Sequence, residues 1–192
     1  MAKHKWLAVW QRPQIPGGLL QLTAGYLEWL QIKNYTIRSL ETIRCRLSCF
    51  LTWCFDRGLD RPEQITRELV QQYHQYLEQL LTWRNQPLTL RGRNRYLGAV
   101  TQLCHWLAQQ GHLLYDPAAD ITLPRVGQRL PRRVLSYQQI EHIFSQIDLR
   151  QPDGLRDRAI LETLYSCGLR ASELIGLALS DVNLSAGSLL VR

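Results

Sequence analysis

An arginine stands at the joint between two apolar helical segments in the stretch LYSCGLRASELIGL, residues 164–177. Gly168 interrupts the apolar run, Arg170 follows it, and Glu173 comes three residues later, within reach of a guanidinium on a helix. A guanidinium that a carboxylate holds rigid is suited to a planar, bidentate anion such as a phosphate. The alternative is structural, because an arginine near a helix C-terminus also offsets the helix dipole and pairs with a nearby acid. Both interpretations stay open at this point.

A second group of polar side chains lies outside the apolar stripes of two expected helices. Arg91, Arg95, Gln102 and His105 fall on one side of the helix expected at residues 89–111, and Arg44 and Arg46 lie off the stripe of the helix expected at 39–58. Such side chains can donate to phosphates or to guanine edges, although a solvated cationic face is the alternative. The predicted DNA contacts are Arg44, Arg46, Arg91, Arg93, Asn94, Arg95 and Gln102.

The placement of charge along the chain favours DNA contact over a merely solvated cationic face. Residues 1–129 hold 16 of the lysines and arginines against 9 acidic residues, whereas residues 130–192 hold seven of each. The whole net charge of +7 therefore belongs to the first two thirds of the chain, and arginine supplies nearly all of it. An arginine-rich part beside a neutral part fits phosphate recognition.

Helical periodicity runs through the first part. Apolar positions predict helices over residues 19–33, 39–58, 66–81 and 89–111, with Ser39 as an N-cap and with Gly58 and Gly111 as stops. Short loops join the helices, which predicts a compact four-helix bundle.

The pattern changes after this bundle. Pro117, Pro124 and Pro131 interrupt a stretch without helical period, which predicts an extended linker. Next come a helix with a Ser136-x-x-Gln139 capping box, a helix closed by Gly168, and a short helix. Five apolar residues are expected to form the inner face of these last helices: Leu164, Leu169, Leu174, Ile175 and Leu177. A strand beginning at residue 188 would have no partner in this chain, so we expect the second domain to be cut off.

Several classes of protein are excluded. The hydrophobic content of 45% excludes a disordered chain, and no apolar run reaches the 18 or so residues of a membrane span. Five cysteines without scaffold spacing agree with a reducing, cytoplasmic compartment. Cys45 and Cys49 could share a helix face, but no second ligand pair supports a zinc site, so buried thiols are expected instead. The sequence contains no nucleotide loop and no protease or hydrolase motif, and we expect no metal and no small-molecule cofactor.

The stretch from Gly154 to Val191, which contains GLRASELIGL, resembles the opening of the catalytic domain of the tyrosine recombinases, the phage integrase family, and particularly its Xer-like members. Upstream, residues 26–43, 95–125 and 130–144 resemble the family's helical domain, its linker and its first catalytic helix. The resemblance implies a mainly α fold: a four-helix core-binding (SAM-like) bundle, a linker, and the helical start of an α+β catalytic domain. We therefore expect an N-terminal tail at 1–17, a core-binding domain at 18–116, a linker at 117–133 and the catalytic part at 134–192.

The resemblance also implies a mechanism. Family members clamp double-stranded DNA, and a tyrosine attacks a phosphodiester to give a 3′-phosphotyrosyl link without a metal or nucleotide cofactor. Arg170 matches the first catalytic arginine and Glu173 the acidic residue that accompanies it. The full-length enzymes assemble as a tetrameric synapse on DNA, and we expect the protein in the cytoplasm on the nucleoid.

The motifs that carry the remaining chemistry follow the point at which this sequence stops. The family's lysine, its His-x-x-Arg motif and its tyrosine nucleophile are not matched by residues of this chain, and Tyr165 belongs to the helix before Arg170, where an aromatic side chain is ordinarily core. The chain is therefore expected to bind DNA and to be inactive alone. The alternatives are a non-catalytic DNA-binding regulator or decoy derived from a recombinase and, third, a helical protein-interaction module.

Overall fold

The computed structural model describes residues 6–82, 84–127 and 134–191, and the chain divides into two compact units between residues 128 and 129. The elements of the first unit are η1 (Ala8–Gln11), α2 (Leu19–Ile32), α3 (Ile37–Phe55), η2 (Pro62–Gln64), α4 (Arg67–Gln79) and α5 (Leu90–Gln109). The elements of the second unit are α6 (Tyr137–Ser145), α7 (Pro152–Cys167), α8 (Ala171–Gly176), η3 (Leu179–Asp181), β1 (Val182–Asn183) and β2 (Ser188–Leu189). The predicted mainly α fold is confirmed. None of the described helices is both long and apolar enough to cross a membrane.

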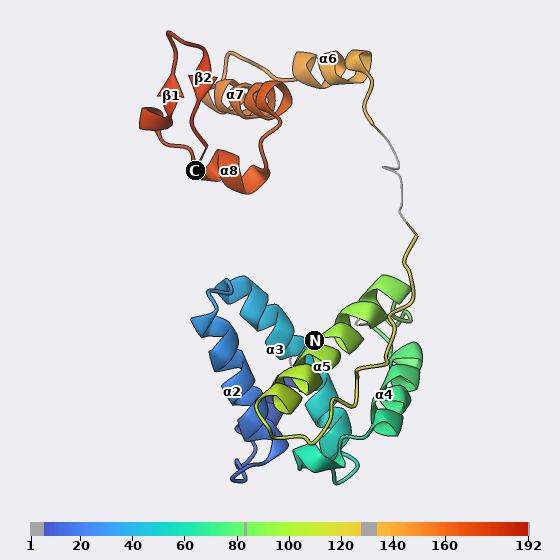
Figure 1. The fold of residues 1–192 in the computed structure, drawn as a ribbon. Coiled ribbons are helices and arrows are strands. Elements are labelled where there is room, and N and C mark those ends of the chain that lie inside the picture. Colours follow the sequence, from blue (N-terminus) through green and yellow to red (C-terminus); the bar gives the residue numbers. More distant parts are fainter. Residues whose placement is uncertain (1–5, 83, 128–133, 192) are drawn as a thin grey trace. The chain divides into compact units, whose positions relative to one another are not determined.

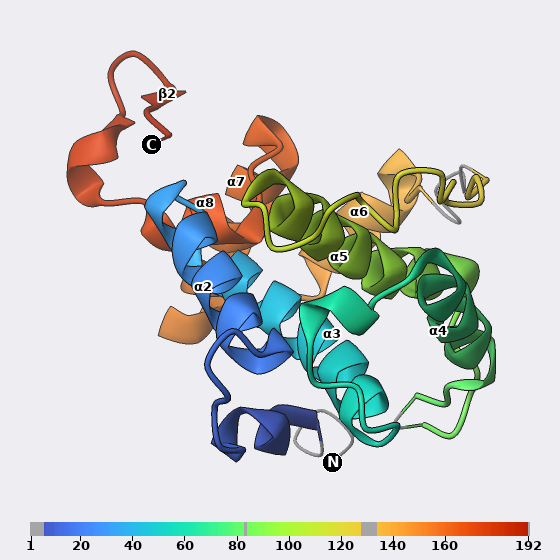
Figure 2. The same cartoon turned by 60° about the horizontal axis from the view of Figure 1, so that its bottom comes forward.

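Helix α5 organises the first unit, because it packs against α2, α3 and α4 (Figure 1 and Figure 2). Its apolar residues recur every three or four positions, so one face of the helix is buried along its length. Five residues at this spacing are buried: Leu97, Val100, Leu103, Cys104 and Leu107.

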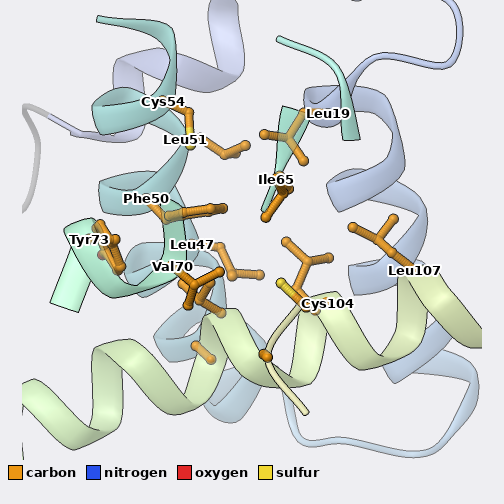
Figure 3. Packing of buried hydrophobic residues seen from close by; sticks show 14 of the residues in the cluster. Leu19, Leu47, Phe50, Leu51, Cys54, Ile65, Val70, Tyr73, Cys104 and Leu107 are labelled. Carbon is orange, nitrogen blue, oxygen red and sulfur yellow. The ribbon is translucent and has the colours of Figure 1, made fainter. Parts of the chain in front are cut away.

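The centre of the first unit is an aromatic and aliphatic core (Figure 3). Phe50 of α3 meets the ring of Tyr73 of α4 edge-on, with ring centroids 4.9 Å apart, and both side chains are fully buried. Leu19 of α2 and Leu107 of α5 close the same core from the other helices. Because one set of side chains joins all four helices, the unit behaves as a single packed body.

Threonine hydroxyls set where the helices begin. Thr36 is the N-cap of α3, and its hydroxyl accepts the backbone N–H of Ser39. The predicted cap at Ser39 is therefore wrong by three positions, because Ile37 in the first turn is exposed and does not belong to the buried stripe of the helix. Thr66 and Thr89 cap α4 and α5 in the same way.

The N-terminal residues belong to the first unit from Trp6 onward. Val9 is buried in the core, and η1 packs against α3. The indole N–H of Trp10 donates to the hydroxyl of Ser48 at 2.7 Å. The described part of the segment predicted as a tail thus packs on this unit from Trp6 onward, because Trp6, Val9 and Trp10 find apolar surface on α3 and α5.

The first residues of the predicted linker also pack on the helices of this unit. Pro117 and Ala118 are buried, Asp120 pairs with Arg67 of α4 at 3.2 Å, and the Asn94 amide donates to the carbonyl of Pro124 at 2.7 Å. These contacts fix the path of the chain from 116 to 124. Residues 128–133 of the predicted linker lie outside the described residues.

The second unit is held by an arginine at the contact between α6 and α7. The Arg158 guanidinium lies over the ring of Phe144, 4.5 Å from its centroid, and donates to the Phe144 carbonyl at 3.0 Å. Tyr165 packs edge-on against the same ring but stays 54% exposed, which differs from the expected core position. Ile175 is 85% exposed, so its predicted inward position is wrong: it points away from the face that α8 turns to α7.

The capping box at the start of α6 is confirmed, with Ser136 and Gln139 bonded reciprocally. At the far end of the unit, β2 pairs antiparallel with β1, with Val182 opposite Leu189. The prediction that this strand has no partner in the chain is therefore wrong. Two-residue strands are too short for an alternating pattern to reveal them.

Gly168 ends α7 in the left-handed region, at φ +63°, while Gly176 of α8 lies outside that region and has open space where an alanine methyl group would lie. We expect Gly168→Ala to destabilise the second unit by about 1 kcal/mol, because an alanine is strained in this conformation. The matched Gly176→Ala variant is expected to be neutral or stabilising. Amide hydrogen exchange in α7 and α8 measures both, and equal effects of the two substitutions would contradict the assignment.

Candidate nucleic-acid interface

Arg170 and Glu173 form a compact pair at the start of α8. Glu173 accepts the backbone N–H of Arg170 at 2.8 Å through Oε2 and its Nη1 at 2.5 Å through Oε1. The Arg170 side chain is still 82% exposed, whereas that of Glu173 is 23% exposed. The carboxylate thus fixes one side of the guanidinium and leaves the rest open to an anion. This pairing belongs to both interpretations of Arg170, so its contact with phosphate stays a prediction.

The same contacts set the charge state of Glu173. The pKa of its carboxyl is lowered, first because it accepts the Arg170 backbone N–H and then because of the hydrogen bond from the guanidinium. A lowered pKa means that the pair stabilises the folded unit above the ordinary glutamate pKa of about 4.3, and that this stabilisation disappears as pH falls through the folded value.

We expect Arg170→Gln to raise the Glu173 pKa only part of the way to its ordinary value, because the backbone donor remains. An NMR titration of the Glu173 side chain measures this directly. A pKa that does not move, or one that returns fully, would show that only one of the two donors acts on the carboxyl. In Glu173→Gln, the fall in stability of the second unit at acid pH is expected to be smaller than in the wild type.

A groove between the first halves of α3 and α5 gathers arginines in the first unit. It has a volume of about 670 Å³. We call it the basic groove; its lining is Leu7, Arg38, Glu41, Thr42, Arg44, Cys45, Arg46, Gly92, Arg95 and Tyr96. Four guanidiniums against the carboxylate of Glu41 make it cationic, so it is suited to a polyanion.

Arg46 and Arg95 lie close enough to act on each other. The pKa of Arg46 is lowered, mainly by burial and then by the positive charge of Arg95. Negative charge bound beside these two side chains would relieve the repulsion between them. Arg46 and Arg95 are thus two guanidiniums of the basic groove that a polyanion could neutralise together.

The other predicted DNA contacts are distributed differently. Arg93 points toward α4 and pairs with Glu78 at 2.6 Å, and its side chain is only 23% exposed. The Asn94 amide donates to the carbonyl of Pro124. Arg91 is exposed in the first turn of α5 and is not part of the lining of the basic groove. Consecutive residues of a helix point about 100° apart, so Arg93, Asn94 and Arg95 cannot all face one groove.

Gln102 lines a different hollow, of about 610 Å³, between α2, α5 and the chain at 116–121. There His105 pairs with Asp116 at 3.3 Å, so that His105 is engaged with the first unit itself. The polar residues that the sequence places on one side of α5 therefore line two separate hollows: Arg95 lines the basic groove, and Gln102 and His105 line the other.

Seven of the ten residues that line the basic groove were not among the predicted DNA contacts: Leu7, Arg38, Glu41, Thr42, Cys45, Gly92 and Tyr96. Arg38 precedes Arg46 by eight residues, and this spacing, which places both on one helix face, could have revealed it. Tyr96 is half-buried, and burial raises its pKa to about 12. Leu7 comes from the N-terminal segment, for which no periodic pattern exists.

The described residues contain no group of three or more histidine, cysteine or acidic side chains that could hold a metal ion. Cys45 is only half-buried, whereas Cys49, Cys54 and Cys104 are buried, as expected, and burial raises the pKa of Cys49 and of Cys104 to about 12. These thiols are therefore protonated packing groups.

Comparison with known proteins decides the family. Residues 133–192 match the model of the phage integrase family. The "Tyrosine recombinase XerC 2" of Ralstonia nicotianae is 36% identical over 174 residues, which cover 91% of this chain and 50% of that protein. The chain belongs to the tyrosine recombinase (phage integrase) family. It is Xer-like: the "Tyrosine recombinase XerD" of Pseudomonas aeruginosa is 36% identical over 83% of this chain and 50% of its own length.

A further XerD recombinase, from Proteus mirabilis, is 32% identical over 85% of this chain and 49% of its own length. The chain thus spans about half the length of the curated relatives that it matches. The family model covers the second unit, with the Arg170–Glu173 pair. The match to the Ralstonia recombinase extends over most of both units, since it leaves out less than a tenth of the chain.

Proposed function

We propose that the chain is the DNA-binding N-terminal part of a site-specific DNA recombinase that breaks and rejoins double-stranded DNA through a 3′-phosphotyrosyl intermediate. The observation that carries this proposal is the basic groove, in which Arg38, Arg44, Arg46 and Arg95 converge. Membership of the tyrosine recombinase family supports it. The bound duplex would place phosphates of its backbone against these guanidiniums and release condensed counterions.

In this proposal Arg170 contacts the scissile phosphate and Glu173 holds the guanidinium in place. Negative charge grows on the non-bridging oxygens in the transition state, so a donor that is already oriented helps the transition state more than the ground state. Removal of one such donor costs on the order of 3–4 kcal/mol of transition-state stabilisation in other enzymes. The nucleophilic tyrosine is not assigned to any residue of this chain.

The test has two readouts on the 192-residue chain. Affinity for a labelled DNA duplex, measured between about 50 and 200 mM salt, is expected to fall steeply, with a slope of about 0.9 for each phosphate contacted. Incubation with a nicked suicide substrate is expected to give no covalent adduct. Affinity that does not depend on salt would favour a protein-interaction module, and a phosphotyrosyl adduct would show that the chain carries its own nucleophile.

An experiment that adds the C-terminal half of a Xer recombinase in trans distinguishes a recombinase from a non-catalytic regulator. Restored cleavage supports the recombinase, whereas binding without cleavage identifies a regulator or decoy.

We also propose that the complete enzyme self-associates on DNA as a tetrameric synapse, in the cytoplasm on the nucleoid. Size measurement of the complex on a recombination site tests the assembly.

A further inference from the structure

The N-terminal segment reaches the basic groove at two points, one on α3 and one on α5. On α3, the guanidinium of Arg44 lies over the ring of Trp10, 5.0 Å from its centroid. On α5, the ring of Trp6 meets Tyr96 edge-on, with centroids 6.1 Å apart and planes at 82°. Leu7, between the two tryptophans, lines the groove itself.

Hydrogen bonds to α3 fix the orientation of the Trp10 ring. Its indole N–H donates to the Ser48 hydroxyl at 2.7 Å, and this hydroxyl donates in turn to the Arg44 carbonyl at 2.7 Å. The ring therefore cannot turn away from Arg44 without breaking a half-buried hydrogen bond. Val9, next to it, is buried in the core and anchors the segment.

We infer that Trp10 is a positioning residue for DNA binding: it holds Arg44 ready for a backbone phosphate in the basic groove. A free arginine must give up rotamer freedom when it binds, and a guanidinium that already lies on an aromatic face gives up less. Trp10 itself does not touch the phosphate. This inference rests on the proposed binding of DNA by the basic groove.

The test compares duplex affinity and its salt dependence in Trp10→Leu, Trp10→Phe, Arg44→Gln and the double variant Trp10→Leu/Arg44→Gln. We expect Trp10→Leu to weaken binding about threefold to tenfold. Trp10→Phe is expected to restore most of the affinity, because it keeps an aromatic face although it lacks the indole N–H. Arg44→Gln is expected to reduce the salt slope by about 0.9. In the double variant Trp10→Leu adds nothing to Arg44→Gln, because Trp10 acts through Arg44.

Controls separate positioning from folding. Arg57 is also held on a tryptophan, 4.1 Å above the Trp53 ring, but it lies beyond the C-terminal end of α3. Arg57→Gln is expected to leave duplex affinity close to that of the wild type. Thermal unfolding of each variant, read by tryptophan fluorescence, reports any weakening of the packing around Val9.

Two results would overturn the inference while leaving DNA binding intact. One is that Trp10→Leu binds as well as the wild type. The other is that Trp10→Leu weakens binding equally with and without Arg44, which would mean that Trp10 supports the fold. A wild-type chain without salt-dependent affinity for the duplex would instead overturn both this inference and the proposed function.

Discussion

The double variant Arg46→Gln/Arg95→Gln is expected to bind duplex DNA at least about 100-fold more weakly than the wild type at physiological salt. A hydrogen bond to a charged group contributes about 1.5–3 kcal/mol, and about 1.4 kcal/mol is a tenfold change in affinity. The two guanidiniums both line the basic groove, and the positive charge of Arg95 lowers the pKa of Arg46 further after the larger effect of burial. The slope of affinity against salt is expected to fall by about two, because each guanidinium binds one phosphate in the proposed complex.

A matched control removes the same charge elsewhere on the first unit. Arg12 lies over Phe55 and near Asp56, and Arg57 lies over Trp53, so both lie at the C-terminal end of α3 and outside the basic groove. Arg12→Gln/Arg57→Gln is expected to change affinity only by the weak long-range effect of two charges. Equally weakened binding in the two double variants would mean that net charge, and not the basic groove, attracts DNA. The groove variant is not expected to be less stable, because it removes a repulsion.

Phe50→Ala is expected to destabilise the first unit by about 3–5 kcal/mol. The side chain is fully buried, stacks on Trp53 and meets Tyr73 edge-on, so truncation leaves a cavity that the surrounding helices cannot fill. A domain has only about 5–15 kcal/mol of stability, so this destabilisation is a large part of the total. DNA binding would weaken with it, since the basic groove exists only while α3 and α5 are packed together.

Tryptophan fluorescence in a urea titration measures this change in stability. All six tryptophans lie at or before position 106, so the signal reports the first unit alone. Ile32→Ala serves as the control, because Ile32 is 79% exposed at the end of α2 and its truncation should change stability by no more than about 0.5 kcal/mol. A Phe50→Ala chain as stable as this control would contradict the core described for α3.

The features that sequence predicted well are those that repeat along a helix or depend on neighbouring residues. Leu47, Phe50 and Cys54 recur at helical spacing and are buried, and the Ser136 capping box needs only a local pattern. The start of α3 was missed because Thr36 and Ser39 are both good caps, and the exposed Ile37 between them offered no way to choose.

Contacts between distant parts of the chain were beyond reach of such patterns. The sequence grouped Arg93, Asn94 and Arg95 as DNA contacts, but Glu78 and the carbonyl of Pro124 engage the first two. Both partners belong to other segments, 15 and 30 residues away. The N-terminal segment has no period at all, so the stacking of Trp10 under Arg44 could be seen only in three dimensions.

The ion pair at the start of α8 has a consequence for how the two units divide recognition. Arg170 and Glu173 together carry no net charge, and residues 130–192 as a whole are neutral. In the proposed complex, their hold on a phosphate would therefore depend on the direction of hydrogen-bond donors and not on long-range attraction. Salt should weaken capture of DNA by the first unit and hardly change how the second unit discriminates one phosphate from the next. Ionic strength would then control the capture of DNA by the first unit, while the fit of the Arg170 guanidinium would control which phosphate the second unit holds.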